Sequence, residues 1–245
     1  MRNDASRVGT ALLTTAFFAI LAIGLMVLGA RFGFWEPIVG FGLVRTYMNP
    51  VGMAVVGLAV MGLIHQLATR HRAGAVKAGI ASLIGVGLLA PMFYGQMQPS
   101  MRFPPIHDIT TDTGHPPVFL ALKDNRAGAT NTLVYGGPAV AAQQKNAYPD
   151  IAPIQSRKSA PEAFAQALRV GKAMGWETIA QDPNGLRFEA TTRTSVYRFV
   201  DDVVVVVTPV DTASRIDIRS VSRVGRGDMG VNAARIRNFA KAFVR

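Results

Sequence analysis

Four side chains that commonly bind metal lie in one short segment: His107, Asp108, Asp112 and His115. Imidazole and carboxylate groups ligate zinc and other divalent ions, so His107, Asp108 and Asp112 form the candidate site of a metal-dependent enzyme. Their spacing matches no standard metal motif, and prolines stand on both sides. The alternative is an extended strap that docks on the following domain, with Asp and Thr side chains capping backbone amides.

Two neighbouring acids, Asp201 and Asp202, precede a run of valines. Adjacent residues of a strand point to opposite faces, whereas general acid–base catalysis needs two groups that converge on one bond. We therefore expect structural ion pairs at these positions, with Arg215 or Arg219 of the neighbouring strand as a partner, and no catalytic residue.

The segment Arg215–Ser220 alternates between charged and apolar residues, as a strand with one buried face does. Ile216 and Ile218 should point inward, and the outward set should consist of Arg215, Arg219 and Arg223, with Arg226 nearby. Guanidinium groups bind carboxylates and phosphates with paired hydrogen bonds, so this set is a candidate site for lipid head groups or an acidic partner. The alternative is a solvated sheet face, partly neutralised by Asp217.

The elements that position these side chains are typical of a two-layer α+β domain. Ser159 and Glu162 form a capping box that starts a helix, and Asp182–Gly185 is typical of a turn. The valine run Val203–Val207 does not alternate, so its strand should be central, with both faces covered. The predicted order is a helix, about four antiparallel strands and a helix, at 160–174, 176–181, 186–192, 196–207, 215–220 and 231–244.

Six short strings in this half of the chain carry a family resemblance. They are 104–112, 148–151, 174–177, 201–204, 217–225 and 228–236. In content and order they resemble a bacterial and plastid family, the domain-of-unknown-function family 1499, from Phe103 to Phe243. The resemblance implies frequent membrane anchoring and no established activity. The chain has no phosphate-binding glycine loop, and we expect no cofactor.

Three apolar runs precede this domain, at about 8–30, 46–69 and 78–98. Each is long enough for a helix that crosses a hydrocarbon core of ~30 Å, which needs roughly 20 residues. The first run is an alternative candidate for a signal peptide, but it exceeds the roughly 7–15 apolar residues of such segments. No Asp, Glu, Lys or Arg lies within the runs, which argues against a transporter. The sequence therefore predicts a transmembrane region at 1–102, an extended strap at 103–153 and a domain core at 154–245.

Basic residues near the ends of these runs set the expected orientation. One side holds five of them: Arg2, Arg7, Arg70, Arg72 and Lys77. The other side holds Arg31, Arg45 and Arg102. The sequence thus predicts a multi-pass protein of the bacterial inner membrane with a cytoplasmic amino terminus and a periplasmic domain. The loop 35–44, which is apolar, is expected at the membrane interface.

The amino-acid composition excludes several classes of protein. The 245 residues include no cysteine, 49% are hydrophobic and 17% are charged, which excludes a disulfide scaffold and a disordered chain. The net charge of +11 is divided between both halves, and no basic–aromatic recognition motif is present, so no nucleic acid is expected. We favour a non-enzymatic membrane protein whose domain binds membrane lipids or an envelope protein. The alternative is the metal-dependent envelope enzyme.

Overall fold

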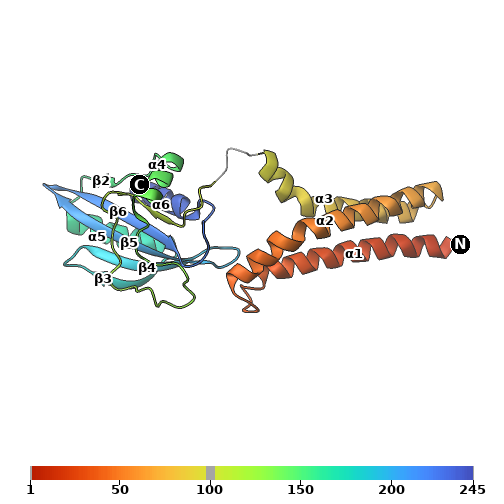
Figure 1. Ribbon diagram of the computed structural model, residues 1–245, viewed down its shortest axis with the longest axis horizontal. Coiled ribbons are helices and arrows are strands. Elements are labelled where there is room, and N and C mark those ends of the chain that lie inside the picture. Colours follow the sequence, from red (N-terminus) through yellow and green to blue (C-terminus); the bar gives the residue numbers. More distant parts are fainter. Residues whose placement is uncertain (1, 98–102, 245) are drawn as a thin grey trace. The chain divides into compact units, whose positions relative to one another are not determined.

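The computed structural model describes residues 2–97 and 103–244, which form two compact units. The helical unit, residues 1–102, contains three long α-helices, and the sheet unit, residues 103–245, contains an antiparallel sheet with three further helices (Figure 1). The predicted end of the third span at residue 98 and the predicted boundary at residue 102 lie outside the described residues.

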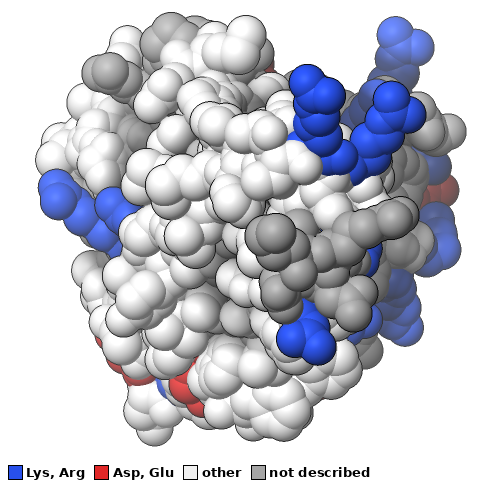
Figure 2. All heavy atoms as spheres, turned by 90° about the vertical axis from the view of Figure 1, so that its right-hand side faces the viewer, with Lys and Arg blue, Asp and Glu red and all other residues white. Residues whose placement is uncertain are grey.

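The helices of the first unit are α1 (Arg2–Leu28), α2 (Pro37–Ala68) and α3 (Arg72–Met97). Each is long and apolar enough to cross a membrane, which confirms the three predicted apolar helices. The amino ends of α1 and α3 lie together, because Lys77 Nζ donates to Thr10 Oγ1 at 2.8 Å and Gly9 lies against the backbone of Gly74. Figure 2 shows the molecule from the right-hand side of Figure 1, the side of the amino terminus. In this view the surface is mostly uncharged, and basic side chains lie around its edge.

The second helix begins earlier than the sequence predicted. Pro37 occupies the first turn of α2, where its fixed φ suits a helix and its missing N–H costs no hydrogen bond. Residues 37–44, expected to be part of an interfacial loop, are therefore helical. Trp35 packs between Gly29 and Gly40, where a Cβ atom at either glycine would overlap the indole ring.

Small residues bring the three helices together. Ala16, Val55, Ala59 and Ala81 form their buried contact. A Cβ atom at Gly85 would lie 2.9 Å from the backbone nitrogen of Val56, so α2 and α3 approach closely at this point. Small residues permit this approach of helix backbones in membranes.

The sheet unit contains six antiparallel strands, two more than the approximate number predicted. They are β1 (Asp108–Thr110), β2 (Ile154–Ser156), β3 (Glu177–Asp182), β4 (Arg187–Arg193), β5 (Val200–Val210) and β6 (Ala213–Ser222). The order is β1-β6-β5-β4-β3, and β2 also pairs with β6. The two additional strands, β1 and β2, have three residues each and therefore show no periodicity in the sequence.

Three helices accompany the sheet: α4 (Gly137–Ala147), α5 (Ala160–Ala173) and α6 (Val231–Val244). The capping box of Ser159 and Glu162 is present at the start of α5. The sequence does not predict α4, and the expectation of an extended strap over 103–153 is wrong at these residues. One face of the sheet packs against α5 and α6 in a core that includes Phe164, Trp176, Phe188 and Phe239.

The opposite face of the sheet is also covered, but by a loop. Residues 111–135, which we call the strap loop, place Phe119, Leu122 and Leu133 against this face. Along β5, Val203, Val205 and Val207 belong to the helix-side core, whereas Val204 and Val206 belong to the strap-side cluster. The prediction that the valine strand is central, with both faces covered, is confirmed.

Candidate functional site

The arginine set lies beneath the strap loop. Arg215 and Arg219 of β6 and Arg223, the first residue after it, lie on one side of the sheet, as the alternation predicted, but that side is not solvated. Arg219 is 1% exposed, Arg215 and Arg223 are partly buried, and Arg226 is exposed in the loop after β6. The expectation that these side chains point outward is therefore wrong for Arg219, because the strap loop packs over it.

Arg219 is held by a paired set of hydrogen bonds to Asp108. Its Nε donates to Oδ1 of Asp108 at 2.9 Å and its Nη2 to Oδ2 at 2.6 Å. The same guanidinium donates to the carbonyl oxygens of Pro117 at 3.1 Å and Leu133 at 2.8 Å, both in the strap loop. This arrangement neutralises the buried charge and fixes the strap loop to the sheet.

The other two arginines also bind the strap loop. Arg215 pairs with Asp217 on its own strand and with Asp112 of the strap loop. Arg223 pairs with Asp202 at 2.8 Å and donates to the carbonyl oxygen of Ala127 at 2.9 Å. Of the set that the sequence assigned to an external partner, Arg215, Arg219 and Arg223 are thus engaged by the chain itself.

The acids around the valine strand have partners other than those expected. Asp202, on the strap side, binds Arg223 and Arg126, and Asp201, on the helix side, binds Arg235 of α6. Neither pairs with Arg215 or Arg219, because these two are held by other acids. The two carboxylates lie on opposite faces of β5 and do not converge on one bond.

A polar group fixes the start of α6. Asp228 accepts hydrogen bonds from the backbone nitrogens of Gly230 and Asn232 at 2.9 and 2.7 Å. Burial raises the pKa of this carboxyl group. The Asn232 side chain donates to the carbonyl oxygen of His107 and to Ser222. The network ties α6 to the sheet.

The proposed metal ligands are not brought together. Asp108 is engaged by Arg219, and Asp112 accepts from the backbone nitrogens of Gly114 and His115 as well as from Arg215. The hydrogen bond from His115 holds the pKa of Asp112 below its usual value. His107 Nδ1 lies 3.4 Å from the carbonyl oxygen of Arg226.

Within residues 2–97 and 103–244, no group of three or more His, Asp or Glu side chains is placed to hold a metal ion. The described residues therefore give no support to the metal-dependent alternative built on His107, Asp108 and Asp112. The other interpretation of this segment, a strap that docks on the domain, agrees with the contacts of Asp108 and Asp112.

A pocket opens over Arg219 at the edge of the strap loop, and we call it the Arg219 pocket. Its volume is about 340 Å³. Most of its lining is apolar and comes from the strap loop: Pro116, Val118, Phe119, Leu122, Leu133 and Val134. The charged residues of the lining are Arg219, which is buried, and Lys123 and Asp124, which are exposed, and Tyr135 also lines the pocket.

Two aromatic rings flank the guanidinium in this pocket. The centroids of Phe119 and Tyr135 lie 5.5 and 5.4 Å from Cζ of Arg219, a distance suited to cation–π attraction. The Tyr135 hydroxyl is buried and has no hydrogen-bond partner among the described residues. Burial raises the pKa of this phenol to about 12, and the charge of Asp108 contributes in the same direction.

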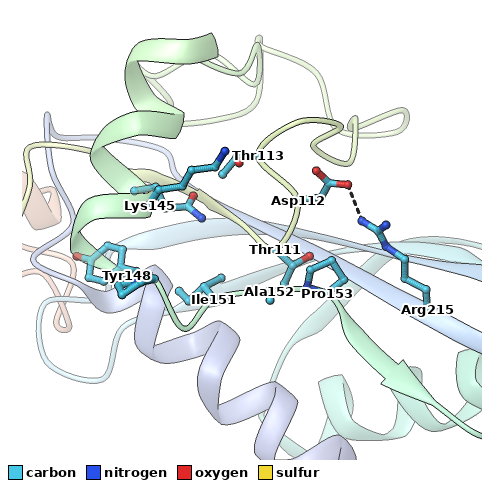
Figure 3. A pocket seen from close by; sticks show the side chains of 11 residues that line it. Thr111, Asp112, Thr113, Lys145, Tyr148, Ile151, Ala152, Pro153 and Arg215 are labelled. Atoms are coloured by element: carbon cyan, nitrogen blue, oxygen red, sulfur yellow. Dashed lines mark hydrogen bonds and ion pairs between the residues drawn. The ribbon is translucent and has the colours of Figure 1, made fainter.

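A second hollow, of about 330 Å³, lies between α4 and the first residues of the strap loop. Figure 3 shows Lys145 and Tyr148 on one side and Asp112 with Arg215 on the other. The Asp112 carboxylate already binds Arg215. Lys145 is exposed. Because the charged groups of this hollow are paired or solvated, it is a weaker candidate for a binding site than the Arg219 pocket.

Sequence reasoning missed Glu189, Tyr135 and Phe119. Glu189 is 2% exposed and its carboxylate accepts backbone N–H groups of Leu120, Ala121 and Leu122, which holds the strap loop in place. Neighbouring residues of a strand face opposite sides of the sheet, so Glu189 faces away from Phe188, but nothing local in the sequence indicates what covers the glutamate. Tyr135 and Phe119 lie in the strap loop, where the sequence shows no hydrophobic periodicity.

The sheet unit matches the model of a known protein family. The family model described as "Protein of unknown function (DUF1499)" matches residues 108–243, which is more than half of the chain. No curated protein matches the chain. The match includes all six strands of the sheet unit, α4, α5 and all but the last residue of α6. The chain therefore belongs to the DUF1499 family.

Proposed function

We propose that this chain is a membrane protein with three spans that holds its sheet unit at the outer face of the bacterial inner membrane. The excess of basic residues at Arg7, Arg70, Arg72 and Lys77 supports a cytoplasmic amino terminus. An odd number of spans then brings the sheet unit to the periplasmic side. In this arrangement the domain is part of the cell envelope.

We further propose that the sheet unit binds a small, largely apolar molecule from the membrane in the Arg219 pocket. The observation that carries this proposal is a largely apolar pocket lined by Arg219, whose charge Asp108 neutralises. Pockets of this kind, with few polar groups among apolar walls, are the usual form of small-molecule sites. Exposed apolar side chains border it, with Val118 62% and Val134 72% exposed.

The charges around the pocket indicate the polar end of the ligand. Asp108 already satisfies Arg219 with two hydrogen bonds, and Lys123 is balanced by Asp124, so the site has no net charge to attract an anion. The Tyr135 hydroxyl is a donor without an acceptor. An unsatisfied buried polar group costs about 1–3 kcal/mol. A ligand with a neutral acceptor oxygen, such as the ester carbonyl of a diacylglycerol, fits this chemistry better than a fatty-acid carboxylate.

Photo-crosslinking of the full-length protein tests this proposal. The probe is a diacylglycerol with a diazirine in one acyl chain, added to the protein in detergent micelles. We expect crosslinks to concentrate in residues 116–135, with competition by unlabelled dioctanoylglycerol and weaker competition by octanoate. Crosslinks spread over the sheet unit, or a copurifying polypeptide bound at 116–135 in place of lipid, would contradict the proposal.

A matched pair of variants controls for folding. Val134→Trp places a large side chain at the exposed rim of the pocket, and Val210→Trp places the same side chain at an exposed position at the end of β5. The proposal requires that Val134→Trp abolish the crosslinks in 116–135 and that Val210→Trp preserve them.

A further inference from the structure

One end of the sheet unit collects three chain segments. Arg193 pairs with Val200, and Asp201 pairs with Ser222, so the loop between β4 and β5 and the loop after β6 leave the sheet at the same end. The first residues of the unit join them, because the backbone nitrogen of Ser222 donates to the carbonyl oxygen of His107 at 2.9 Å.

The first described residue after α3 is fixed at this end. The ring of Phe103 lies against Gly230, where a Cβ atom would be 2.6 Å from Cε1 of the phenylalanine. The backbone nitrogen of Asp228 donates to the carbonyl oxygen of Ile106 at 3.2 Å. Only residues 98–102 separate Met97 of α3 from Phe103, and an extended chain of that length spans at most roughly 20 Å. In sequence, Phe103 at this end of the unit therefore follows the apolar helix α3 after five residues.

The exposed side chains at this end are apolar and basic. Phe103 is 43% exposed, Val196 47% and Met229 60%. Arg193 and Arg226 are exposed, and Arg198 is partly exposed. We call these six residues the tether-end surface.

Asp201, Asp202 and Asp228 at the same end are internal, and Asp124, which is exposed, pairs with Arg126 of the strap loop. Asp201 and Asp202 are at most 1% exposed and pair with arginines, and both carboxylate oxygens of Asp228 accept backbone N–H groups at the start of α6. The charge that this end presents to its surroundings is therefore positive.

We propose that the tether-end surface docks on the membrane that the helical unit spans. Apolar side chains among basic ones bind the interface of bilayers that contain anionic lipids, with the apolar groups at the acyl boundary and the cations at the head groups. Phe103 of this surface is five residues of sequence from α3, a helix apolar enough to cross a membrane. This docking does not depend on a ligand in the Arg219 pocket.

The cysteine-free sequence permits a direct test with a single spin label. Val196→Cys and Val210→Cys are matched, because both valines are exposed to a similar extent, 47% and 44%. Val196 precedes one end of β5 and Val210 is the last residue of this strand, which is about 33 Å long at the usual rise of a strand. The full-length labelled protein is reconstituted in vesicles of equal parts phosphatidylcholine and phosphatidylglycerol.

We expect the label at position 196 to collide with a water-soluble nickel chelate several-fold less often than the label at position 210, and with oxygen more often. Equal nickel accessibility at the two positions would overturn the proposal.

Charge reversal tests the basic part of the surface. In the Val196→Cys background, Arg193→Glu, Arg198→Glu and Arg226→Glu together should raise nickel accessibility to the level of position 210. The control variant combines Arg157→Glu with Lys158→Glu, two exposed basic residues at the opposite end of the sheet. This variant should leave the nickel accessibility of position 196 unchanged. If the label at position 196 were equally protected from nickel in the triple variant and its parent, the contribution of the basic residues would be refuted. The same conclusion would follow if the parent were equally protected in vesicles of pure phosphatidylcholine and in vesicles that contain phosphatidylglycerol.

Discussion

Asp108 and Arg219 join two parts of the chain that are 111 positions apart, through two hydrogen bonds between a carboxylate and a guanidinium. Asp108 lies in β1 and Arg219 in β6, the neighbouring strand. Because Arg219 also binds two carbonyl groups of the strap loop, this pair connects the sheet, its edge strand and the loop that covers it. The same guanidinium lines the Arg219 pocket.

Removing Arg219 should strongly destabilise the sheet unit. Arg219→Met leaves the carboxylate of Asp108 buried without its counter-ion, and breaking a buried pair in this way costs about 3–5 kcal/mol. Denaturant unfolding followed by Trp176 fluorescence, in a Trp35→Phe background, measures this cost. The double variant Asp108→Leu/Arg219→Met should recover part of it. A loss below about 1 kcal/mol for the single variant, comparable to exposed Arg157→Met, would contradict the buried pair.

Replacing Glu189 should release the strap loop. Glu189→Gln removes the charge and converts one acceptor oxygen to a donor, so the backbone N–H groups of Leu120, Ala121 and Leu122 lose acceptors. Hydrogen–deuterium exchange should accelerate at 116–135 and stay unchanged in α5. Glu177→Gln, at an exposed position of β3, is the matched control. Unchanged exchange at 120–122 in Glu189→Gln would refute this role.

Tyr135 should make the sheet unit sensitive to alkali. Its pKa is about 12 in the folded protein against 10.0 for an ordinary tyrosine, so the unfolded chain loses the phenol proton first. The contribution to stability is complete below pH 10 and declines as the pH rises toward 12. Tyr135→Phe should therefore show a shallower loss of unfolding free energy with pH in this range. Parallel curves for the two proteins would show that Tyr135 does not contribute.

Two glycines of α3 should respond differently to the same substitution. A Cβ atom at Gly85 would lie 2.6 Å from Cγ2 of Val56, whereas one at Gly87 would meet nothing within 4 Å. Gly85→Leu should separate α2 from α3 and lower the thermal stability of the detergent-solubilised protein, and Gly87→Leu should not. Equal melting of the two variants would contradict the close approach at Gly85.

The sequence was informative where periodicity or capping acts locally. The three apolar helices, the Ser159 capping box and the inward direction of Ile216 and Ile218 followed from such signals, and the structure confirms them. The valine run of β5 indicated two covered faces because a half-exposed strand alternates.

The sequence was not informative where burial depends on distant parts of the chain. Alternation placed Arg219 on the face opposite Ile218, but whether that face meets water depends on the strap loop, which is about a hundred positions earlier. The strap loop is fixed by Glu189 and the arginines of β6, and none of these contacts leaves a local pattern. For the same reason the partners of Asp201 and Asp202 were predicted incorrectly.

The central claim is that the sheet unit and the amino terminus lie on opposite sides of the membrane. Because the chain has no cysteine, Asn184→Cys, in the exposed turn before β4, and Asn3→Cys can each be labelled with a membrane-impermeant maleimide in intact spheroplasts. We predict that position 184 reacts before lysis and that position 3 reacts only after it. Reaction of position 184 only after lysis, or of both positions before it, would contradict the claim.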